Sequence, residues 1–373
     1  MKDLILICSS YKPNTASINR ILSMLRGFDE LEIKVELVFL YPNDNGDVLN
    51  IDELKNVKIV NLWEGHKRNN KVIKYICSFW DAWRYANKLK AGSNVFIPNA
   101  SEYVFLFVRR KNIKVFHERT EHFDVVPMKP YVLQWLYKKS VARLDGLFVI
   151  STTLRDAYKK IGAKNIHIVN MTVDPKRFLG VSKDVTVAPY IAYCGTASNN
   201  KDGVDILIKA FSVVHNKYHK YKLYIIGRAP SKNDESGNYE LVRKLELEDS
   251  VIFTGIIPAS KMPKMLKNAT IVALARPDSL QAKCGFPTKL GEYLLSENPA
   301  VVTRVGDIPL FLEDGKTALI AEPGDVQDFA SRVIWALDHP YDAAIIGKNG
   351  ASVALSHFNY KVETKKIVET IFA

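Results

Sequence analysis

The fold and chemistry of this chain are indicated most clearly by two short stretches, A-R-P-D-S at residues 275–279 and G-F-P-T-K-L-G-E-Y-L at residues 285–294. They predict the end of a strand, a loop, and a helix that is opened by Gly and Pro. The first turn of a helix offers unpaired backbone N–H groups and the positive end of the helix dipole, which together attract anions. Lys289 adds a cation, and Glu292 lies three residues on, on the same helix face.

This pattern suits a diphosphate joined to a ribose, which is what a nucleotide-sugar presents. The cation and the N–H groups suit the diphosphate, and a carboxylate one turn deeper can accept two hydroxyl protons from the ribose. On spacing alone an ordinary alternative stays open, because Pro is common near helix starts and the dipole by itself favours Glu in the first turn.

Apolar, β-rich runs alternate with helical patterns along the chain. Near-continuous apolar strands separated by helices indicate parallel sheets that are covered on both faces. We therefore predict an α/β fold with two doubly wound, Rossmann-like domains, residues 1–175 and 188–355, joined by a polar linker. The runs expected as strands are 4–8, 35–40, 57–60, 95–97, 115–116, 147–150 and 166–169 in the first half, and 190–193, 223–226, 251–253, 271–274, 300–302 and 318–320 in the second.

Ligands of doubly wound sheets bind at the carboxyl ends of the strands, and the cleft between two facing domains is the default site. Glycine at these ends lets the backbone approach a ligand closely, although it is also ordinary turn chemistry. Neither half carries the dinucleotide glycine fingerprint or a P-loop, which disfavours dehydrogenases and NTPases. The residues that follow strands in the second half are Gly195-Thr196, Gly227-Arg228, Gly255-Ile256-Ile257 and Arg276-Pro277-Asp278.

The composition limits the kinds of partner. The chain has 373 residues, is 47% hydrophobic and has a formal net charge of +12. A basic chain suits nucleic acid, anionic lipid or phosphorylated small molecules, but no nucleic-acid module is recognisable, so we expect no nucleic-acid partner. No apolar run approaches the ~18 residues of a membrane span. The four scattered cysteines have no metal or redox spacing, which favours a cytoplasmic protein with reduced thiols.

Basic residues cluster with aromatic ones in the first half, at His66-Lys67-Arg68, residues 71–90 and residues 128–139. Helices of this composition can lie on an anionic membrane surface, which would make the protein peripheral on the inner face of the cytoplasmic membrane. Alternatively, the aromatic side chains pack in the core while the lysines are solvated. Both interpretations stay open at this point.

Several motifs of the second half resemble, in order and spacing, those of the retaining GT-B glycosyltransferases of the family 4 type (glycosyl transferases group 1). A bacterial subgroup with a G-F-P-T-K-L-x-E-Y helix is the most similar. The resemblance covers about 190 residues by motif and the first 150 by architecture alone. It implies two domains that face each other across a cleft, and a C-terminal helix, residues 356–373, that returns to the first domain. The motifs are Gly195, residues 201–205, 223–227 and 251–255, Gly285-Phe286 and Glu292, with residues 170–178 as the linker, Ser151 after a strand, and Phe358 and Tyr360 before the last helix.

The resemblance also implies roles for individual residues. Lys201 would contact the donor diphosphate, and the helix opening at residues 286–290 would do the same through its backbone N–H groups. Glu292 would bind the ribose hydroxyls, and the backbone of residues 255–257 would hold the base. Fixed cations and N–H dipoles would stabilise charge on the departing diphosphate, so no metal or cofactor is expected. The implied donor-binding positions are Gly195, Thr196, Gly227, Arg228, Gly255, Ile256, Ile257, Arg276, Asp278, Cys284, Gly285, Phe286, Pro287, Thr288, Leu290 and Glu292.

Three features depart from the family pattern. Cys284 stands where a second Glu is usual, Thr196 follows Gly195 where Arg is typical, and residues 9–15 replace a Gly-Gly loop. We hypothesise that Arg276, Asp278 and Lys289 replace the missing contacts.

In the first domain, His117 and Glu118 follow the short run at residues 115–116, so we expect them in a loop at the ligand end of the sheet. This resembles a His-containing loop of the family, in which His117 could bond a donor-sugar hydroxyl or the acceptor. A purely structural pairing with Arg119 is the alternative. The predicted catalytic residues are His117, Glu118, Lys201 and Lys289.

Together these features favour a glycosyltransferase that moves a sugar from a nucleotide-sugar to a hydroxyl of a glycan or lipid-linked acceptor, in surface polysaccharide synthesis. Two alternatives stay open: a nucleotide-sugar-binding partner protein with reduced catalysis, and a sugar-nucleotide epimerase of related fold.

Overall fold

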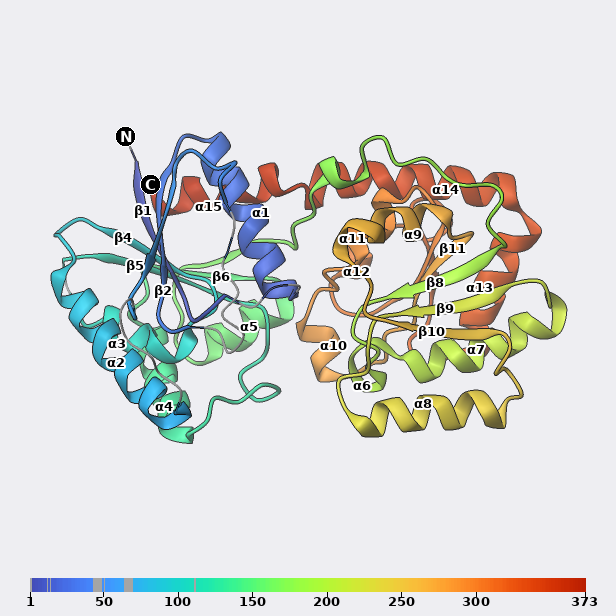
Figure 1. Ribbon diagram of the computed structural model, residues 1–373, viewed down its shortest axis with the longest axis horizontal. Coiled ribbons are helices and arrows are strands. Elements are labelled where there is room, and N and C mark those ends of the chain that lie inside the picture. The colour runs from blue at the N-terminus through green and yellow to red at the C-terminus, as the bar shows by residue number, and fades with distance from the viewer. Residues whose placement is uncertain are drawn as a thin grey trace. The chain divides into compact units, whose positions relative to one another are not determined.

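The computed structural model describes residues 2–11, 13, 15–42, 49, 51–63, 70–110 and 112–373. The basic segment His66-Lys67-Arg68 and two residues of the segment at 9–15, Lys12 and Asn14, lie outside these residues. The chain forms two compact units, one of Met1–Thr172 with Tyr360–Ala373 and one of Val173–Asn359 (Figure 1). The second unit thus starts at Val173, and the chain returns to the first unit at Tyr360. That the two units face each other across a cleft stays a prediction.

The first unit is built on a seven-stranded parallel sheet in the order β3-β2-β1-β4-β5-β6-β7. The order turns back at β1, which lies between β2 and β4. Winding outward from β1 in both directions is the doubly wound pattern that was predicted. The strands are β1 (Asp3–Cys8), β2 (Lys34–Phe39), β3 (Val57–Asn61), β4 (Asn94–Ile97), β5 (Lys114–Arg119), β6 (Gly146–Val149) and β7 (Ile166–Ile168).

Helices cover both faces of this sheet. Figure 1 shows α1 (Ala16–Glu30) and α15 (Tyr360–Ile371) on one face, and α2 (Lys71–Lys88), α3 (Val104–Phe107), α4 (Tyr131–Val141) and α5 (Thr152–Lys160) on the other. A one-turn helix, η1 (Ser101–Tyr103), precedes α3. The core forms where α1 and α15 pack on β1 and β2, and fully buried side chains such as Leu6, Phe28 and Ile367 meet there. Burial of such side chains is the main favourable contribution to folding.

The second unit repeats this plan with a six-stranded parallel sheet in the order β10-β9-β8-β11-β12-β13. Its first strand, β8, again lies where the order reverses, between β9 and β11. The strands are β8 (Tyr190–Cys194), β9 (Lys222–Ile226), β10 (Val251–Gly255), β11 (Ile271–Leu274), β12 (Ala300–Thr303) and β13 (Leu319–Ala321).

The helices of the second unit also lie on both faces, with α7 and α8 on one and α9, α11 and α14 on the other, while α13 packs beside α7 (Figure 1). Their bounds are η2 (Pro175–Phe178), α6 (Asn199–Asp202), α7 (Val204–Lys217), α8 (Lys232–Lys244), η3 (Ala259–Lys261), α9 (Met262–Asn268), α10 (Leu280–Cys284), α11 (Leu290–Leu295), α12 (Ile308–Phe311), α13 (Val326–Asp338), α14 (Pro340–Val353) and η4 (Ala354–Phe358).

Every run that was expected as a strand forms one, but two local predictions were wrong. β5 does not end at Phe116; it continues to Arg119, because β4 and β6 pair with it on both sides. The predicted loop after β11 contains the short helix α10, and the next helix begins only at Leu290, after a turn closed by the Leu290 N–H and the Pro287 carbonyl (3.0 Å). Gly285 has an extended backbone, with φ −92° and ψ 142°, and Phe286 after it is buried, so the helix does not begin at these two residues.

Candidate functional site

The candidate site lies at the carboxyl ends of the central strands in the second unit. A crevice forms where the winding of a doubly wound sheet reverses, and here that point is between β8 and β11. β8 ends at Cys194 and leads into Gly195, and β11 ends at Leu274 and leads into Arg276. The ends of β9 and β10 add Gly227 and Gly255.

Close contacts leave no room for a side chain at two of these glycines, Gly195 and Gly227. Gly195 has a φ of +143°, and a Cβ there would lie 2.5 Å from the Lys289 ammonium nitrogen. Gly227 has a φ of +132°, and a Cβ there would overlap the carbonyl oxygen of Gly195. The Gly195 N–H donates to Ile226 (2.8 Å), and the Gly227 N–H donates to Gly255 (2.9 Å). The three loops are therefore tied together through backbone alone.

A charged cluster lies directly beside Gly195. The Lys289 ammonium group contacts the Asp202 carboxylate at 2.5 Å and the Tyr193 hydroxyl at 3.0 Å. The same hydroxyl lies 2.5 Å from the Thr196 carbonyl oxygen and 3.0 Å from Asp202. Asp202 is buried, and the side chain of Lys289 is 14% exposed. The cation that was predicted for a diphosphate thus has a buried carboxylate as its present partner.

Arg276 lies underneath this cluster. Its side chain is fully buried, and one guanidinium nitrogen donates to the carbonyls of Ala282 (2.9 Å) and Gly285 (3.2 Å). A second guanidinium nitrogen lies 4.0 Å from Asp202. Arg276 therefore holds the end of α10 and the start of the G-F-P-T-K turn in place, and it adds a second cation beside the buried carboxylate.

The protonation of the cluster follows from these neighbours. Burial by itself would raise the pKa of Asp202, but Lys289 and Arg276 hold that pKa below its usual value of 3.8. Burial lowers the pKa of Lys289, and Asp202 opposes this effect. The carboxylate is consequently ionised at neutral pH and balances cations that would otherwise be unpaired in a desolvated place.

Glu292, the predicted ribose ligand, lies in the first turn of α11 and forms an ion pair with Arg177 of η2. Arg177 also donates to the Ala259 carbonyl at 2.8 Å. Both side chains of the pair are partly exposed, at 20% for Glu292 and 29% for Arg177. A ligand diol at Glu292 would therefore have to share or displace an existing charged partner.

The other predicted donor positions differ in their exposure. Asp278 is exposed and forms an ion pair with Lys283 at 2.7 Å. Lys201 lies on α6, half-buried, and Cys284 is fully buried on α10. Of the remaining predicted positions, those with exposed side chains are Thr196, Arg228, Ile256 and Thr288, whereas Ile257 is half-buried, and Phe286, Pro287 and Leu290 are buried.

His117 and Glu118 lie within β5 of the first unit and not in a loop, which corrects the predicted placement. Both ring nitrogens of His117 have partners, the Ile97 carbonyl at 2.6 Å and the Ser101 hydroxyl at 3.2 Å. Burial and the nearby Arg119 lower the pKa of His117 to about 3. The predicted strand was too short because polar residues were taken as its end. In the structure these polar side chains are buried within the strand, where they have hydrogen-bond or ion-pair partners.

Glu118 points to the opposite face of β5 and forms a bidentate ion pair with Arg20 of α1, the shortest contact being 2.7 Å. Arg20 also donates to the carbonyls of Asn170 and Val169. Both side chains are buried. In this structure the pair attaches α1 to the sheet.

Comparisons with known proteins agree with this geometry. Residues 188–339 match the family model for glycosyl transferases group 1. This segment is a glycosyl transferases group 1 domain. The mannosylfructose-phosphate synthase of Agrobacterium fabrum is 26% identical over 53% of this chain and 45% of its own length. The amylovoran biosynthesis glycosyltransferase AmsK of Erwinia amylovora is 21% identical over 63% of this chain and 58% of its own length. The chain thus spans about half the length of the curated relatives that it matches.

A solved structure, Anabaena Alr3699/HepE in complex with UDP and glucose, superposes over 100% of both chains with a TM-score of 0.76 at 14% identity. This likeness and the two doubly wound sheets confirm the predicted GT-B fold class. The predicted resemblance to group 1 glycosyltransferases is likewise confirmed by the family match.

Three residues of the candidate site were not predicted: Tyr193, Asp202 and Arg177. Asp202 follows Lys201 in one motif of the family resemblance, and Arg177 lies in the linker motif at residues 170–178. Their position in these motifs was the signal that could have identified them. Tyr193 reads as one more apolar residue of a buried strand, and only its partners reveal its hydroxyl as part of the cluster.

Within the described residues, no group of three or more His, Cys, Asp or Glu side chains could hold a metal ion. The expectation that the reaction needs no metal or cofactor stays a prediction. In the same part of the chain, no helix is long and apolar enough to cross a membrane.

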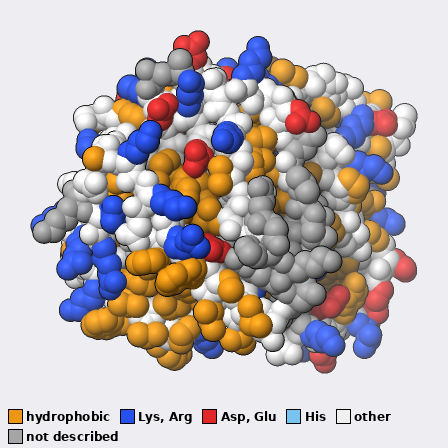
Figure 2. Space-filling model, turned by 60° about the vertical axis from the view of Figure 1, so that its left-hand side comes forward, with side chains coloured by type: hydrophobic (Ala, Val, Ile, Leu, Met, Phe, Trp, Pro, Cys, Tyr) orange, Lys and Arg blue, Asp and Glu red, His pale blue; other side chains and the backbone are white. Residues whose placement is uncertain are grey.

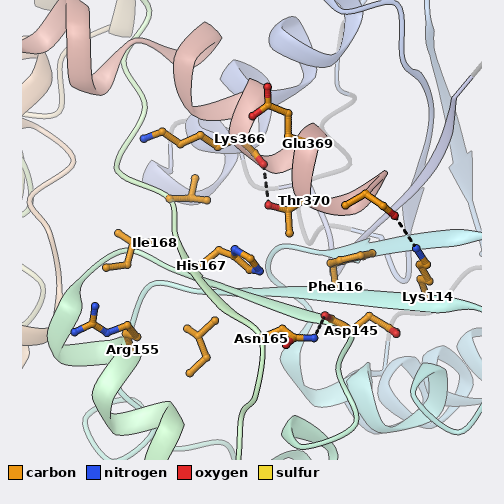
Figure 3. Close-up of a pocket in the computed structure, with 13 residues that line it drawn as sticks. Lys114, Phe116, Asp145, Arg155, Asn165, His167, Ile168, Lys366, Glu369 and Thr370 are labelled. Atoms are coloured by element: carbon orange, nitrogen blue, oxygen red, sulfur yellow. Dashed lines mark hydrogen bonds between the residues drawn. The ribbon is translucent and has the colours of Figure 1, made fainter.

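A hollow of about 1010 Å³ lies in the first unit, and none of the residues that line it is a predicted site residue (Figure 3). Figure 3 shows Lys114, Asp145 and Asn165 along it, which lie where β5, β6 and β7 begin. Ligands of such sheets bind at the opposite ends of the strands. The hollow mixes cations with carboxylates, such as Lys366 and Glu369, and does not define a ligand.

Proposed function

We propose that this chain is a glycosyltransferase of the hexosyltransferase type, which moves a sugar from a nucleotide-sugar to a hydroxyl of a glycan or lipid-linked acceptor. The observation that carries the proposal is the group 1 domain, whose strand ends bring glycines and cations together at the switch point of the sheet. The similar HepE, with UDP and glucose bound, and the mannosylfructose-phosphate synthase support a nucleotide-sugar donor. The similar AmsK supports a setting in surface polysaccharide synthesis.

The donor diphosphate is proposed to lie over Gly195, between Lys201 and Lys289. Gly195 leaves the ammonium group of Lys289 room beside the backbone. Asp202 holds this ammonium group in position beside Gly195, where it would face the charge that develops on the departing diphosphate. A cation that is already in position when charge develops lowers the barrier without reorganisation.

The ribose is proposed to bind at Glu292, with its hydroxyl groups donating to the carboxylate that Arg177 now contacts. The base would then lie along Gly255, Ile256 and Ile257 at the end of β10, where the backbone is the main contact. The proposed reaction retains the configuration of the transferred sugar. It is proposed to need no metal ion, because the cationic side chains of this site would stabilise the diphosphate.

A nucleotide-sugar-binding partner protein with reduced catalysis is the second candidate, because Cys284 is fully buried and offers no carboxylate beside the donor sugar. Donor binding without transfer or hydrolysis would favour it. The epimerase alternative has no support from His215 and His219. His215 lies in the last turn of α7 and contacts Ser250 at 3.1 Å, and His219 lies in the turn after this helix and not in the helix that was predicted for it. Both are at the opposite end of the sheet from the ligand side.

The test is a thermal-shift panel with UDP-, GDP-, ADP- and TDP-sugars, each with and without Mg²⁺. A donor that binds only the native state raises the melting temperature by linkage. We expect a shift from one nucleotide, unchanged by Mg²⁺ and lost in Glu292→Gln.

The matched control is Glu322→Gln, which also breaks an Arg–Glu pair of the second unit, with Arg304 at 2.8 Å. This variant should keep the shift. A panel without any shift, or an equal loss in both variants, would contradict the proposed donor site. An assay for transfer or hydrolysis of the donor that binds then distinguishes the two candidate functions: turnover indicates a glycosyltransferase, and binding without turnover indicates a binding protein.

A further inference from the structure

The helix α2 exposes large apolar side chains and buries small ones, which is the reverse of an ordinary surface helix. Its fully buried positions are Ser78, Ala82 and Ala86, four residues apart. The exposed apolar positions follow helical spacing as well and form one stripe. Their exposed fractions are 66% for Val72, 55% for Ile73, 65% for Ile76, 58% for Trp80 and 47% for Trp83.

The helix α4 continues this surface. α3 packs against both α2 and α4, so the three helices are neighbours on one face of the first sheet. The first turns of α4 expose Tyr131 (69%), Val132 (56%) and Trp135 (57%), while Leu133 and Tyr137 are buried. We call Val72, Ile73, Ile76, Trp80, Trp83, Tyr131, Val132 and Trp135 the aromatic stripe. Figure 2 shows hydrophobic side chains gathered over this lower part of the first unit.

Basic residues border the aromatic stripe. Lys and Arg outnumber acidic residues on α2, where Lys74, Arg84 and Lys88 stand against Asp81. α4 carries Lys138, which pairs with Asp124 at 3.4 Å, and Lys139. Lys139 lies over the ring of Trp135, at 6.0 Å from its centroid. Figure 2 shows a group of Lys and Arg side chains next to the hydrophobic ones. The surface is therefore apolar in its middle and positive at its border.

We propose that the aromatic stripe docks the first unit onto an anionic lipid bilayer. Tryptophan and tyrosine favour the interface between headgroups and acyl chains, because their rings are apolar and their N–H or O–H groups stay hydrated. Basic side chains beside them meet anionic headgroups. Apolar area alone would also suit a second copy of this chain, but two copies would bring the same positive border against itself. The inference is independent of the donor site, because docking needs no nucleotide-sugar.

The experiment is flotation of the full chain with vesicles of phosphatidylcholine alone and of phosphatidylcholine with about 30% phosphatidylglycerol. We expect the chain to float with the anionic vesicles and to bind the neutral ones about tenfold less. The test variant is Ile73→Ser/Ile76→Ser/Val132→Ser, which removes exposed side chains only and leaves all tryptophans as reporters. It should lose about tenfold or more in binding. The tryptophan emission of the wild type, but not of the variant, should shift to shorter wavelength on the anionic vesicles.

The matched control is Leu310→Ser/Tyr341→Ser, which removes apolar side chains of the second unit that are 66% and 79% exposed. It should bind like the wild type. Equal binding by the test variant, equal binding to neutral vesicles, or no binding by the wild type would overturn the proposal. Sedimentation without lipid tests the alternative that a second copy of the chain binds this surface. If the wild type is a dimer, the test variant is a monomer and neither binds vesicles, the surface is a dimer interface.

Discussion

Replacing Asp202 by Ala should destabilise the second unit strongly. The substitution leaves the Lys289 ammonium group without its partner at 2.5 Å and removes the carboxylate that lies 4.0 Å from the buried Arg276. Removing one member of a buried ion pair costs about 3–5 kcal/mol, because the remaining charge stays desolvated. For a domain of this size, about 2–4 °C of melting temperature corresponds to 1 kcal/mol, so the loss should be roughly 6–20 °C.

The assay is thermal unfolding followed by circular dichroism, with Asp205→Ala as the matched control. Asp205 lies three residues further on and pairs with Lys209 at 3.2 Å, but its side chain is 29% exposed. An exposed pair of this kind is worth about 1 kcal/mol or less, so the control should melt within about 4 °C of the wild type. Equal melting temperatures for the two variants would refute the reasoning.

The pH dependence of the unfolding free energy is a second test of the same cluster. The pKa of Asp202 is lowered in the folded state, so its stabilising contribution is present above the usual value of 3.8 and is lost as the pH falls through the folded value. The difference in stability between the wild type and Asp202→Ala should therefore begin to narrow as the pH falls below 3.8, and should close only below the folded pKa. A double variant with Lys289→Met should lose less than the sum of the single losses, and additivity within about 0.5 kcal/mol would contradict the pair.

Three further substitutions test other parts of the structure. Gly227→Ala should cost at least about 2 kcal/mol in urea unfolding, because its Cβ meets a carbonyl oxygen, whereas Gly255→Ala has open space and should cost about 1 kcal/mol; equal losses would contradict this. His117 has a folded pKa of about 3, so the unfolded state gains protons first, and the wild type should lose stability as the pH falls from about 6.5 toward 3, while His117→Gln should show a flatter profile. Arg177→Ala frees the proposed ribose ligand and should tighten donor binding up to about fivefold by calorimetry; weaker binding would mean that the arginine itself contacts the donor.

Much of the fold was predictable because strand positions are encoded locally. A parallel strand covered on both faces needs an unbroken apolar run, and such runs marked all the strands of both sheets. The candidate site was predictable where a strand end leads into glycine, as at Gly195 and Gly227. Strand ends made of buried polar residues were not predictable, since His117 and Glu118 look like loop residues until their partners, Ser101 and Arg20, are known.

The sequence by itself determined that this chain forms two doubly wound sheets, and which loops lie at their ligand ends, because apolar periodicity and glycine act over a few neighbouring residues. The tertiary structure alone decided the charge pairing: Asp202 meets Lys289 across 87 residues of chain, and Arg177 meets Glu292 across 115. It also decided which face of α2 is buried. Both faces of this helix carry apolar residues at helical spacing. The face with the small residues Ser78 and Ala82 is the one that packs against the rest of the unit, so Trp80 on the other face is exposed. Such choices depend on contacts between distant segments, which no local pattern records.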